Sequence, residues 1–331
     1  MFDNLLIGFV NETSLIDKII LEDNLPHAIL LSGLEGIGKR RFARTIASKI
    51  ILNLGHKKHH ENQKIVDEKV VSQVFQGTYP DLYLVEEDEG KSTISVDQIR
   101  DTIQNFNLKA YYDQGSIIII NDAHKMTISA ANALLKALEE PENEKFFILI
   151  THQEHLIPET INSRTQSFNC HKRSKAEIQE VINLLSPSES INLPDRLLDH
   201  LDGSLSLLNL SHQIENKTLL AKSEANLIAN IKSKIVELED YIHRIDDIIS
   251  LESKLNIKSQ LIQFLRTNEK DSSIVNVKIN LIAQCLRDLM KSGNNKNLED
   301  LANTILKLSV AQNEIQIRHL DAEIRLADTI S

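Results

Sequence analysis

A glycine-rich segment between an apolar run and a helical pattern constrains the fold of this chain more than any other feature. The segment reads Gly33-Leu34-Glu35-Gly36-Ile37-Gly38-Lys39-Arg40, and the apolar run before it covers residues 27–32. A strand, a glycine turn and a helix in this order are typical of a phosphate-binding loop, because backbone N–H groups and the helix N-terminus converge on phosphate oxygens. The residues predicted to bind nucleotide are Gly33, Gly36, Gly38 and Lys39. The alternative is a turn that only joins a strand to a helix.

Short apolar runs alternate with helical patterns through the N-terminal half. The runs that read as strands are residues 27–32, 81–86, 116–120 and 145–151. They are continuously apolar rather than alternating, which favours a parallel sheet covered by helices on both faces. The clearest helix precedes the last run, and its apolar stripe is formed by Ala130, Ala133, Leu134, Ala137 and Leu138. We expect Thr127 or Ser129 to cap this helix and Pro141 to end it.

The glycine loop lacks the residues that hold a metal ion in working phosphate-loop ATPases. The position after Lys39 needs a hydroxyl that ligates Mg²⁺, but Arg40 has no acceptor and is always charged. The apolar run at 116–120 ends in Asn121 and Asp122, where a metal-linked Asp and a water-activating Glu are expected. Phosphoryl transfer depends on the metal to neutralise charge. The loop is therefore predicted to bind ATP or ADP without hydrolysis, or not to bind nucleotide at all.

The C-terminal half carries helical patterns with few strand signals. From residue 174 onward Leu and Ile recur at helical spacing, through residues 193–210, 225–255, 277–290 and 298–330. Breaks are expected near 186–192 and 203–216. An all-α region of more than one hundred residues is predicted to follow the α/β part.

Composition narrows the kinds of partner and compartment. The chain has 331 residues, with 37 Lys and Arg against 47 Asp and Glu, and a formal net charge of -10. A broad nucleic-acid surface is not expected, since phosphate binding needs clustered basic residues. Cys170 and Cys285 lie far apart and cannot form a disulfide framework. With no membrane-length apolar run and no basic region at the start, a cytoplasmic location is predicted.

Several stretches, in one order, resemble the delta prime subunits of bacterial DNA polymerase III clamp loaders. They are residues 25–28 (LPHA), 79–82 (YPDL), 94–100 (ISVDQIR), 130–141 (AANALLKALEEP), 151–152 (TH) and 161–165 (INSRT). The stretch at 130–141 is the most specific of them. Together the matches cover about residues 5–170, whereas the helical remainder agrees only in length and character.

The resemblance implies an architecture and a role. The chain would comprise an AAA+ P-loop-type domain with a parallel sheet (1–170), a small helical lid (171–210) and an all-α C-terminal collar domain (211–331). It would be a rigid stator in a circular pentamer with gamma or tau motor subunits and delta, a complex that loads the sliding clamp onto primed DNA. No independent catalysis is expected of such a subunit, and its own nucleotide site is typically degenerate.

Arg164 is the residue to which the resemblance assigns chemistry. In this family a Ser-Arg-Cys motif presents the arginine, as a finger in trans, to ATP bound by a neighbouring motor subunit. Guanidinium suits this task because it is always charged and forks onto phosphate oxygens. Here Thr165 replaces the cysteine, which is not the catalytic group. The alternative is that Arg164 only forms a surface ion pair.

Two departures from the family pattern matter. Residues 55–62 contain His56, His59 and His60 but no cysteine, where relatives often carry a four-Cys zinc module, so no metal site is expected. Leu207 stands where motor subunits carry a nucleotide-sensing arginine. Two other roles remain open, an ATP-hydrolysing gamma- or tau-like motor of the same complex and an unrelated P-loop kinase. Neither explains the sequence as well, because Arg40 and Asn121 disfavour a motor and residues 130–141 disfavour a kinase.

Overall fold

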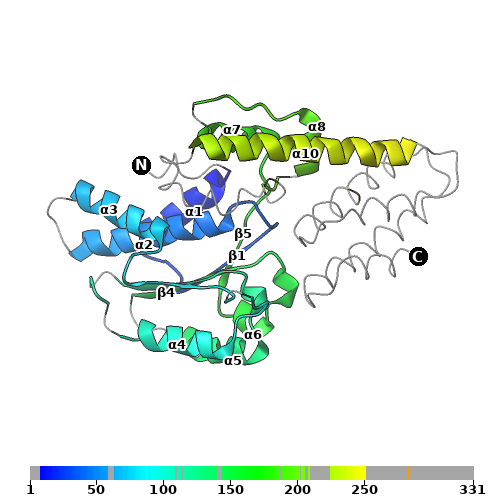
Figure 1. Cartoon of the computed structure of the whole chain (residues 1–331). Helices are drawn as coiled ribbons and strands as arrows, with labels where there is room; N and C mark the ends of the chain where they lie inside the picture. Colours follow the sequence, from blue (N-terminus) through cyan, green and yellow to red (C-terminus); the bar gives the residue numbers. More distant parts are fainter. Residues whose placement is uncertain are drawn as a thin grey trace. The chain divides into compact units, whose positions relative to one another are not determined.

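The computed structural model (Figure 1) describes part of the chain. The described ranges are residues 8–58, 63–88, 90–108, 110–112, 115–139, 144–186, 188–201, 203–205, 208, 224–250 and 282. These residues fall into two compact units, the first within 1–192 and 201–228 and the second within 193–200 and 229–331. Glu140, Pro141, Cys285, Leu207, His59 and His60, on which several sequence expectations rest, lie outside the described residues.

The first unit is built on a five-stranded sheet in which every paired strand is parallel. Its order is β2-β3-β4-β1-β5, and the strands are β1 (Ala28–Ser32), β2 (Leu82–Val85), β3 (Ser116–Ile120), β4 (Lys145–Ile150) and β5 (Gln166–Asn169). The predicted parallel α/β sheet is therefore confirmed. The strand β5 was missed because it lies at the sheet edge and is mostly polar. Of its four residues only Phe168 is buried, so no apolar run marks it.

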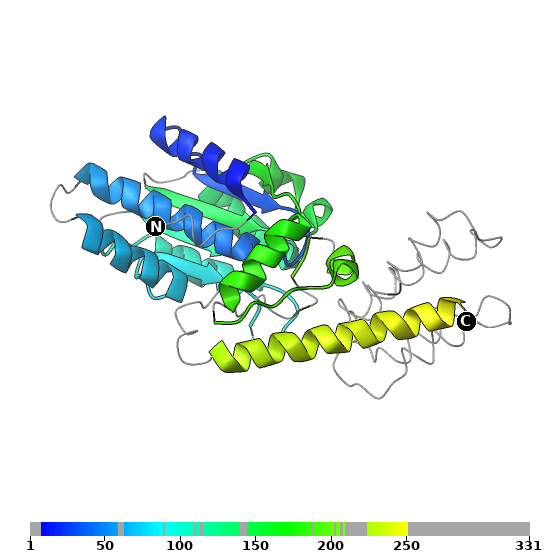
Figure 2. The ribbon, with the colours of Figure 1, turned by 90° about the horizontal axis from the view of Figure 1, so that it is seen from above.

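Helices cover both faces of this sheet, as Figure 1 shows. On one face lie α1 (Val10–Leu21), α2 (Lys39–Lys58) and α3 (Gln63–Gln76), and on the other α4 (Val96–Phe106) and α5 (Ile128–Glu139). Alternate strand residues supply the two cores: Ile29 and Leu31 of β1 pack on the α1–α3 side, and Leu30 packs on the α4–α5 side. Because side chains on both faces of the strand are buried, its sequence is continuously apolar rather than alternating. Figure 2 views the α1–α3 layer from above.

The helix α5 confirms the predicted stripe and cap. Ala130, Leu134 and Leu138 are buried against the sheet, and Thr127 Oγ1 accepts a hydrogen bond from the N–H of Ala130 at 3.1 Å. Thr127 rather than Ser129 therefore caps the helix. Two short helices follow β4, α6 (Glu159–Asn162) before β5 and α7 (Lys175–Leu185) after it.

Two further helices agree with the predicted helical C-terminal region. They are α8 (Asp195–Leu201) and α10 (Glu224–Ser250). The predicted helices at 277–290 and 298–330, and with them most of the collar domain, fall outside the described residues apart from Ile282, and the boundaries at 170 and 210 stay predictions. Where the structure describes the chain, no helix combines the length and the hydrophobicity needed to cross a membrane.

Asp81 ties the start of β2 to the segment before β3. It is 3% exposed, and its carboxylate accepts hydrogen bonds from the backbone N–H groups of Tyr111 (2.7 Å) and Tyr112 (3.1 Å). Hydrogen bonds to a charged group contribute about 1.5–3 kcal/mol. We expect Asp81→Ala to lower the free energy of unfolding by about 2 kcal/mol in urea titrations. The exposed Asp101 on α4 is the matched control, and Asp101→Ala should change it by less than about 0.5 kcal/mol. Equal effects would contradict this role of Asp81.

Candidate nucleotide site

The glycine loop joins β1 to α2 and brings the four predicted binding residues into one turn. Gly33, Gly36 and Gly38 have φ values of 141°, 75° and 93°. Residues with a Cβ rarely adopt such positive values. Space is short as well. A Cβ on Gly33 would lie 2.4 Å from the backbone oxygen of Cys170, and one on Gly38 would lie 2.6 Å from Arg173 Nη2. The turn therefore requires glycine at these positions.

The Lys39 side chain folds back onto its own loop. Its Nζ donates hydrogen bonds to the carbonyl oxygens of Gly33 (2.7 Å) and Leu34 (2.5 Å). Lys39 is 6% exposed, and this burial lowers its pKa to about 8. Two of the three ammonium donors are thus engaged by the loop rather than presented to a phosphate.

The Arg40 guanidinium lies among acidic side chains that follow the carboxyl ends of β2 and β3. Nη2 lies 2.9 Å from Asp122 Oδ2 and Nη1 lies 3.5 Å from Glu86 Oε2. Asn121 also donates to Glu86 Oε2, at 3.2 Å. Glu86 follows β2, whereas Asn121 and Asp122 follow β3, and these strands are neighbours in the sheet. The guanidinium therefore pairs with the carboxylates that follow β2 and β3, next to the glycine loop.

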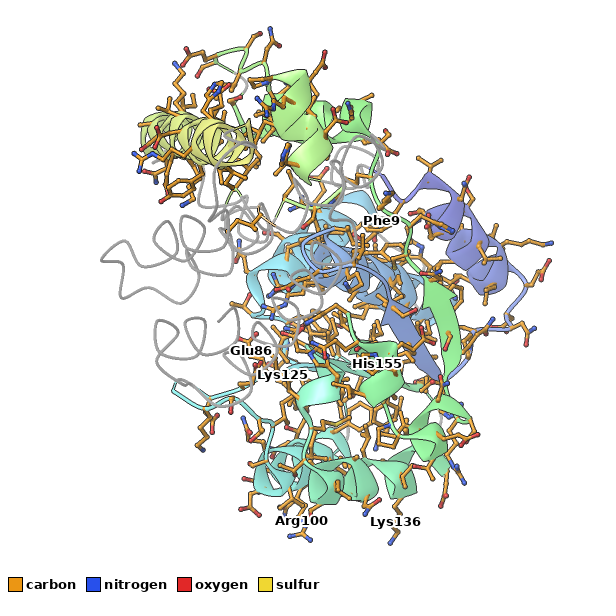
Figure 3. The ribbon with its side chains drawn as sticks, turned by 90° about the vertical axis from the view of Figure 1, so that its right-hand side faces the viewer. Phe9, Glu86, Arg100, Lys125, Lys136 and His155 are labelled. Atoms are coloured by element: carbon orange, nitrogen blue, oxygen red, sulfur yellow. The ribbon has the colours of Figure 1, made fainter. Side chains whose placement is uncertain are left out.

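Asp122 is the centre of this cluster. Its backbone is left-handed, with φ of 48°, and its carboxylate also lies 3.6 Å from Lys125 Nζ and 3.4 Å from His152 Nδ1. Burial alone would raise the pKa of Asp122, but the His152 hydrogen bond and the charges of Lys125 and Arg40 hold it well below its usual range. Figure 3 shows Glu86 and Lys125 close together on this side of the molecule.

Two histidines complete the cluster. The rings of His124 and His152 meet edge to face, with centroids 4.2 Å apart. Burial, together with the neighbouring His152, lowers the pKa of His124 to about 4, so this ring is neutral at pH 7.

Segments remote in sequence cover the loop. Ser204 Oγ donates to the carbonyl of Glu35 at 2.7 Å, and the N–H of Leu205 donates to that of Gly36 at 3.1 Å. The Arg173 guanidinium, 5.3 Å from the centroid of the Phe9 ring, reaches Gly38. With the Lys39 bonds, four consecutive loop carbonyls, from 33 to 36, have partners inside the chain. These contacts tie the loop carbonyls to Lys39 and to residues 204–205.

Arg164 lies just after α6, and α6 itself packs on the α4–α5 side of the sheet (Figure 1). Its Nη2 lies 2.7 Å from Glu139 Oε1 at the end of α5, and its Nη1 donates to the carbonyl of Thr160 at 2.9 Å. About a third of the side chain, 36%, is exposed. Arg164 thus belongs to a different part of the molecule from the glycine loop, and it forms the surface ion pair that the sequence left as an alternative.

Comparison with known proteins places the chain in a family. A family model described as DNA polymerase III, delta subunit, matches residues 11–174. A DNA polymerase III subunit delta' of Pseudomonas aeruginosa is 32% identical over 178 residues, which are 54% of this chain and 53% of that protein. These matches support assigning the chain to the clamp-loader delta prime family. This confirms the resemblance drawn from residues 25–165.

The chain is also similar to a tau subunit and to a gamma subunit-related protein. A DNA polymerase III subunit tau of Bacillus subtilis is 29% identical over 195 residues, covering 59% of this chain and 33% of that protein. A solved gamma subunit-related protein of Thermotoga maritima superimposes with a TM-score of 0.46 at 14% identity, over 95% of this chain and 97% of that one. The chain spans about half the length of the delta' relative from Pseudomonas and less of the tau subunit.

Three contacts in these regions were not predicted from the sequence. They are the contacts of Glu86 with Arg40, of Glu139 with Arg164, and of His124 with His152. The meeting of His124 with His152 could have been predicted from the sequence. Polar residues directly follow the two apolar runs at 116–120 and 145–150, and carboxyl ends of parallel strands meet at one sheet edge. The two ion pairs depend on strand order and helix packing, which the sequence does not give.

Proposed function

We propose that this chain is the non-hydrolysing stator of a DNA polymerase III clamp loader. In that complex it would sit in a ring with gamma or tau motor subunits and delta, and would help to load the sliding clamp onto primed DNA during replication. The observation that carries the proposal is the pairing of Arg40 with Asp122 and Glu86 beside a closed glycine loop.

The ion pairs explain why hydrolysis is not expected. Mg²⁺ requires oxygen ligands in near-octahedral geometry, and Arg40 offers none while its charge already pairs with the local carboxylates. Asn121 cannot supply the metal-linked carboxylate. A metal ion contributes several kcal/mol to charge stabilisation in such a transition state, and about 1.4 kcal/mol corresponds to a factor of ten in rate. Turnover at this loop should therefore be slower than at a motor site by orders of magnitude.

Nucleotide binding without hydrolysis is a weaker option for the same loop. A phosphate would have to draw Lys39 away from the carbonyls of Gly33 and Leu34, where its Nζ donates two hydrogen bonds. The contacts of Ser204 and Leu205 with the loop favour the closed arrangement further. No cofactor is required for the proposed stator role.

The second part of the proposal is that Arg164 serves a neighbouring motor subunit as an arginine finger. The ion pair with Glu139 does not oppose this, because exposed pairs contribute only about 0–1 kcal/mol. A triphosphate from the neighbour, with several negative charges and bidentate geometry, can compete for the exposed guanidinium. Meanwhile Glu139 and the Thr160 carbonyl keep the guanidinium ordered at the end of α6, which limits the entropy lost on engagement.

The motor role is the alternative, supported by the tau relative of Bacillus subtilis. We expect purified chain to show ATP hydrolysis no higher than background, alone or with clamp and primed DNA. Mixed with motor and delta subunits, it should enter one closed pentamer on size exclusion.

Lys39→Ala should leave the ATPase of that pentamer nearly unchanged, because Lys39 is bound to its own loop. Hydrolysis by the chain alone, or a large loss in Lys39→Ala, would favour the motor role.

A further inference from the structure

We propose that Asp122, His124 and His152 form a binding site for one divalent transition-metal ion, with Zn²⁺ as the best-matched ion. One carboxylate oxygen and one nitrogen from each ring all lie within 4.8 Å of one another. The proposal concerns this chain alone and holds whether or not the chain is a stator.

The sheet brings the three residues together. Asp122 and His124 follow β3, His152 follows β4, and the two strands pair in parallel with Ile120 opposite Leu149. Their carboxyl ends therefore stand side by side. The left-handed backbone at Asp122 starts the short 3-10 turn at Ala123–Lys125, which places His124 next to the His152 ring.

The distances suit coordination by imidazole and carboxylate. Asp122 Oδ1 lies 3.4 Å from His152 Nδ1, close to the roughly 3.3 Å between two ligand atoms that each lie about 2.0–2.1 Å from a tetrahedral Zn²⁺. His124 Nε2 supplies an independent indication. It is buried, and among the described residues it has no hydrogen-bond partner. A buried ring nitrogen without a partner is costly, and a metal ion at this position would satisfy it.

Neighbouring groups can orient both rings as in known metal sites. Thr151 Oγ1 lies 3.1 Å from His124 Nδ1, so a proton on Nδ1 directs the Nε2 lone pair toward the cluster. His152 Nε2, the ring nitrogen that is not used for binding, lies 3.2 Å from Gln153 Nε2 and 4.0 Å from Glu35 Oε2. Ligating histidines usually have such a partner on the second nitrogen, which fixes the tautomer and raises ligand basicity.

The local charges allow a cation at this point. Arg40 and Lys125 approach Asp122 through Oδ2, which leaves Oδ1 for the metal. Both cations also pair with a second carboxylate, Arg40 with Glu86 and Lys125 with Glu87. Two imidazoles and one carboxylate favour Zn²⁺ and its neighbours in the transition series over Mg²⁺, which prefers oxygen ligands. The site thus differs in chemistry from the magnesium site that Arg40 and Asn121 have lost.

The test uses the full-length chain, free of any histidine tag and treated with chelator, in competition titrations of Zn²⁺ and in Co²⁺ absorption spectra. We expect one ion per chain, and Co²⁺ bands in the visible range. His124→Gln and His152→Gln should each weaken Zn²⁺ binding by at least about tenfold, since even second-shell changes cost about 10–100-fold. Thr151→Val, which keeps all three ligands, should weaken it less.

The matched control removes the other histidine cluster in the sequence. The triple variant His56→Asn, His59→Asn, His60→Asn should keep the ion and the Co²⁺ bands. Binding that persists in both His124→Gln and His152→Gln, or disappears in the triple variant, would overturn the proposal, as would the absence of any stoichiometric ion. Melting temperatures of the metal-free variants identify any that fail to fold. In that case Thr151→Val decides: a weaker affinity for Zn²⁺ than wild type supports the proposal, and an unchanged affinity overturns it.

Discussion

Replacing Arg164 with alanine is expected to slow ATP hydrolysis at the one motor site that faces this chain by about 10³–10⁵-fold. The reason is the loss of a charge that is always present and forks onto phosphate oxygens in the transition state. The measurement is a single-turnover assay on the assembled clamp loader with clamp and primed DNA. The burst amplitude should fall by the fraction that this one motor site contributes. The rates of hydrolysis at the other motor sites should not change.

The controls separate a finger from a structural arginine. Arg164→Ala should leave assembly intact, because the side chain is partly exposed and its Glu139 pair contributes little to stability. Arg164→Lys keeps the charge but not the fork, and should recover only part of the rate. Arg100→Ala removes an exposed arginine of α4 whose Nη1 lies 3.9 Å from Asp97 Oδ1, and should have no effect. A fully assembled Arg164→Ala complex with an unchanged burst would show that Arg164 serves only its ion pair.

The inner strands of the sheet were predictable because burial on both faces makes each of them a continuous apolar run. The strands β1, β3 and β4 lie inside the sheet, and their residues are almost all buried, so continuous apolar runs identified them. At the edge, β5 has one buried residue in four and left no such mark. The capped helix α5 was equally readable, since Thr127 and the apolar stripe are local features.

The site was predictable only in its local part. The glycines of the loop, and the absence of metal-ligand side chains at Arg40 and Asn121, can each be read from a short local stretch of sequence. What Arg40 does instead depends on Glu86, which comes from a strand that follows α3 in the chain but lies next to β3 in the sheet. A sequence gives residue types at strand ends, whereas partners across the sheet follow from strand order. The Lys39 side chain illustrates the same limit, because its direction is set by packing around the loop.

Stability at alkaline pH should reveal where the Lys39 ammonium lies. In the folded chain burial lowers the pKa of Lys39 to about 8 from 10.5. Between these values the unfolded chain holds a proton that the folded chain has lost, so the unfolding free energy rises with pH. Below pH 8 Lys39 is charged in both the folded and the unfolded state, and burial of its ammonium lowers the free energy of unfolding. At about 1.4 kcal/mol per pKa unit, wild type should gain about 3 kcal/mol over Lys39→Met from pH 8 to pH 10.5.

The difference between the two proteins is the quantity to measure, in urea titrations across this range. Burial raises the pKa of Cys170 to about 12 and that of Tyr79 above its usual range. Both groups therefore reduce stability at high pH, in wild type and in Lys39→Met alike. The contribution of Tyr79 cancels in the difference, whereas that of Cys170 cancels only in part, because Cys170 and Lys39 interact electrostatically. Lys18→Met is the control, because Lys18 is 70% exposed on α1 and should give a flat difference. A flat result for Lys39→Met would mean that the ammonium is solvated and the loop open, as phosphate binding requires. A rise of the expected size would support a loop closed on its own lysine.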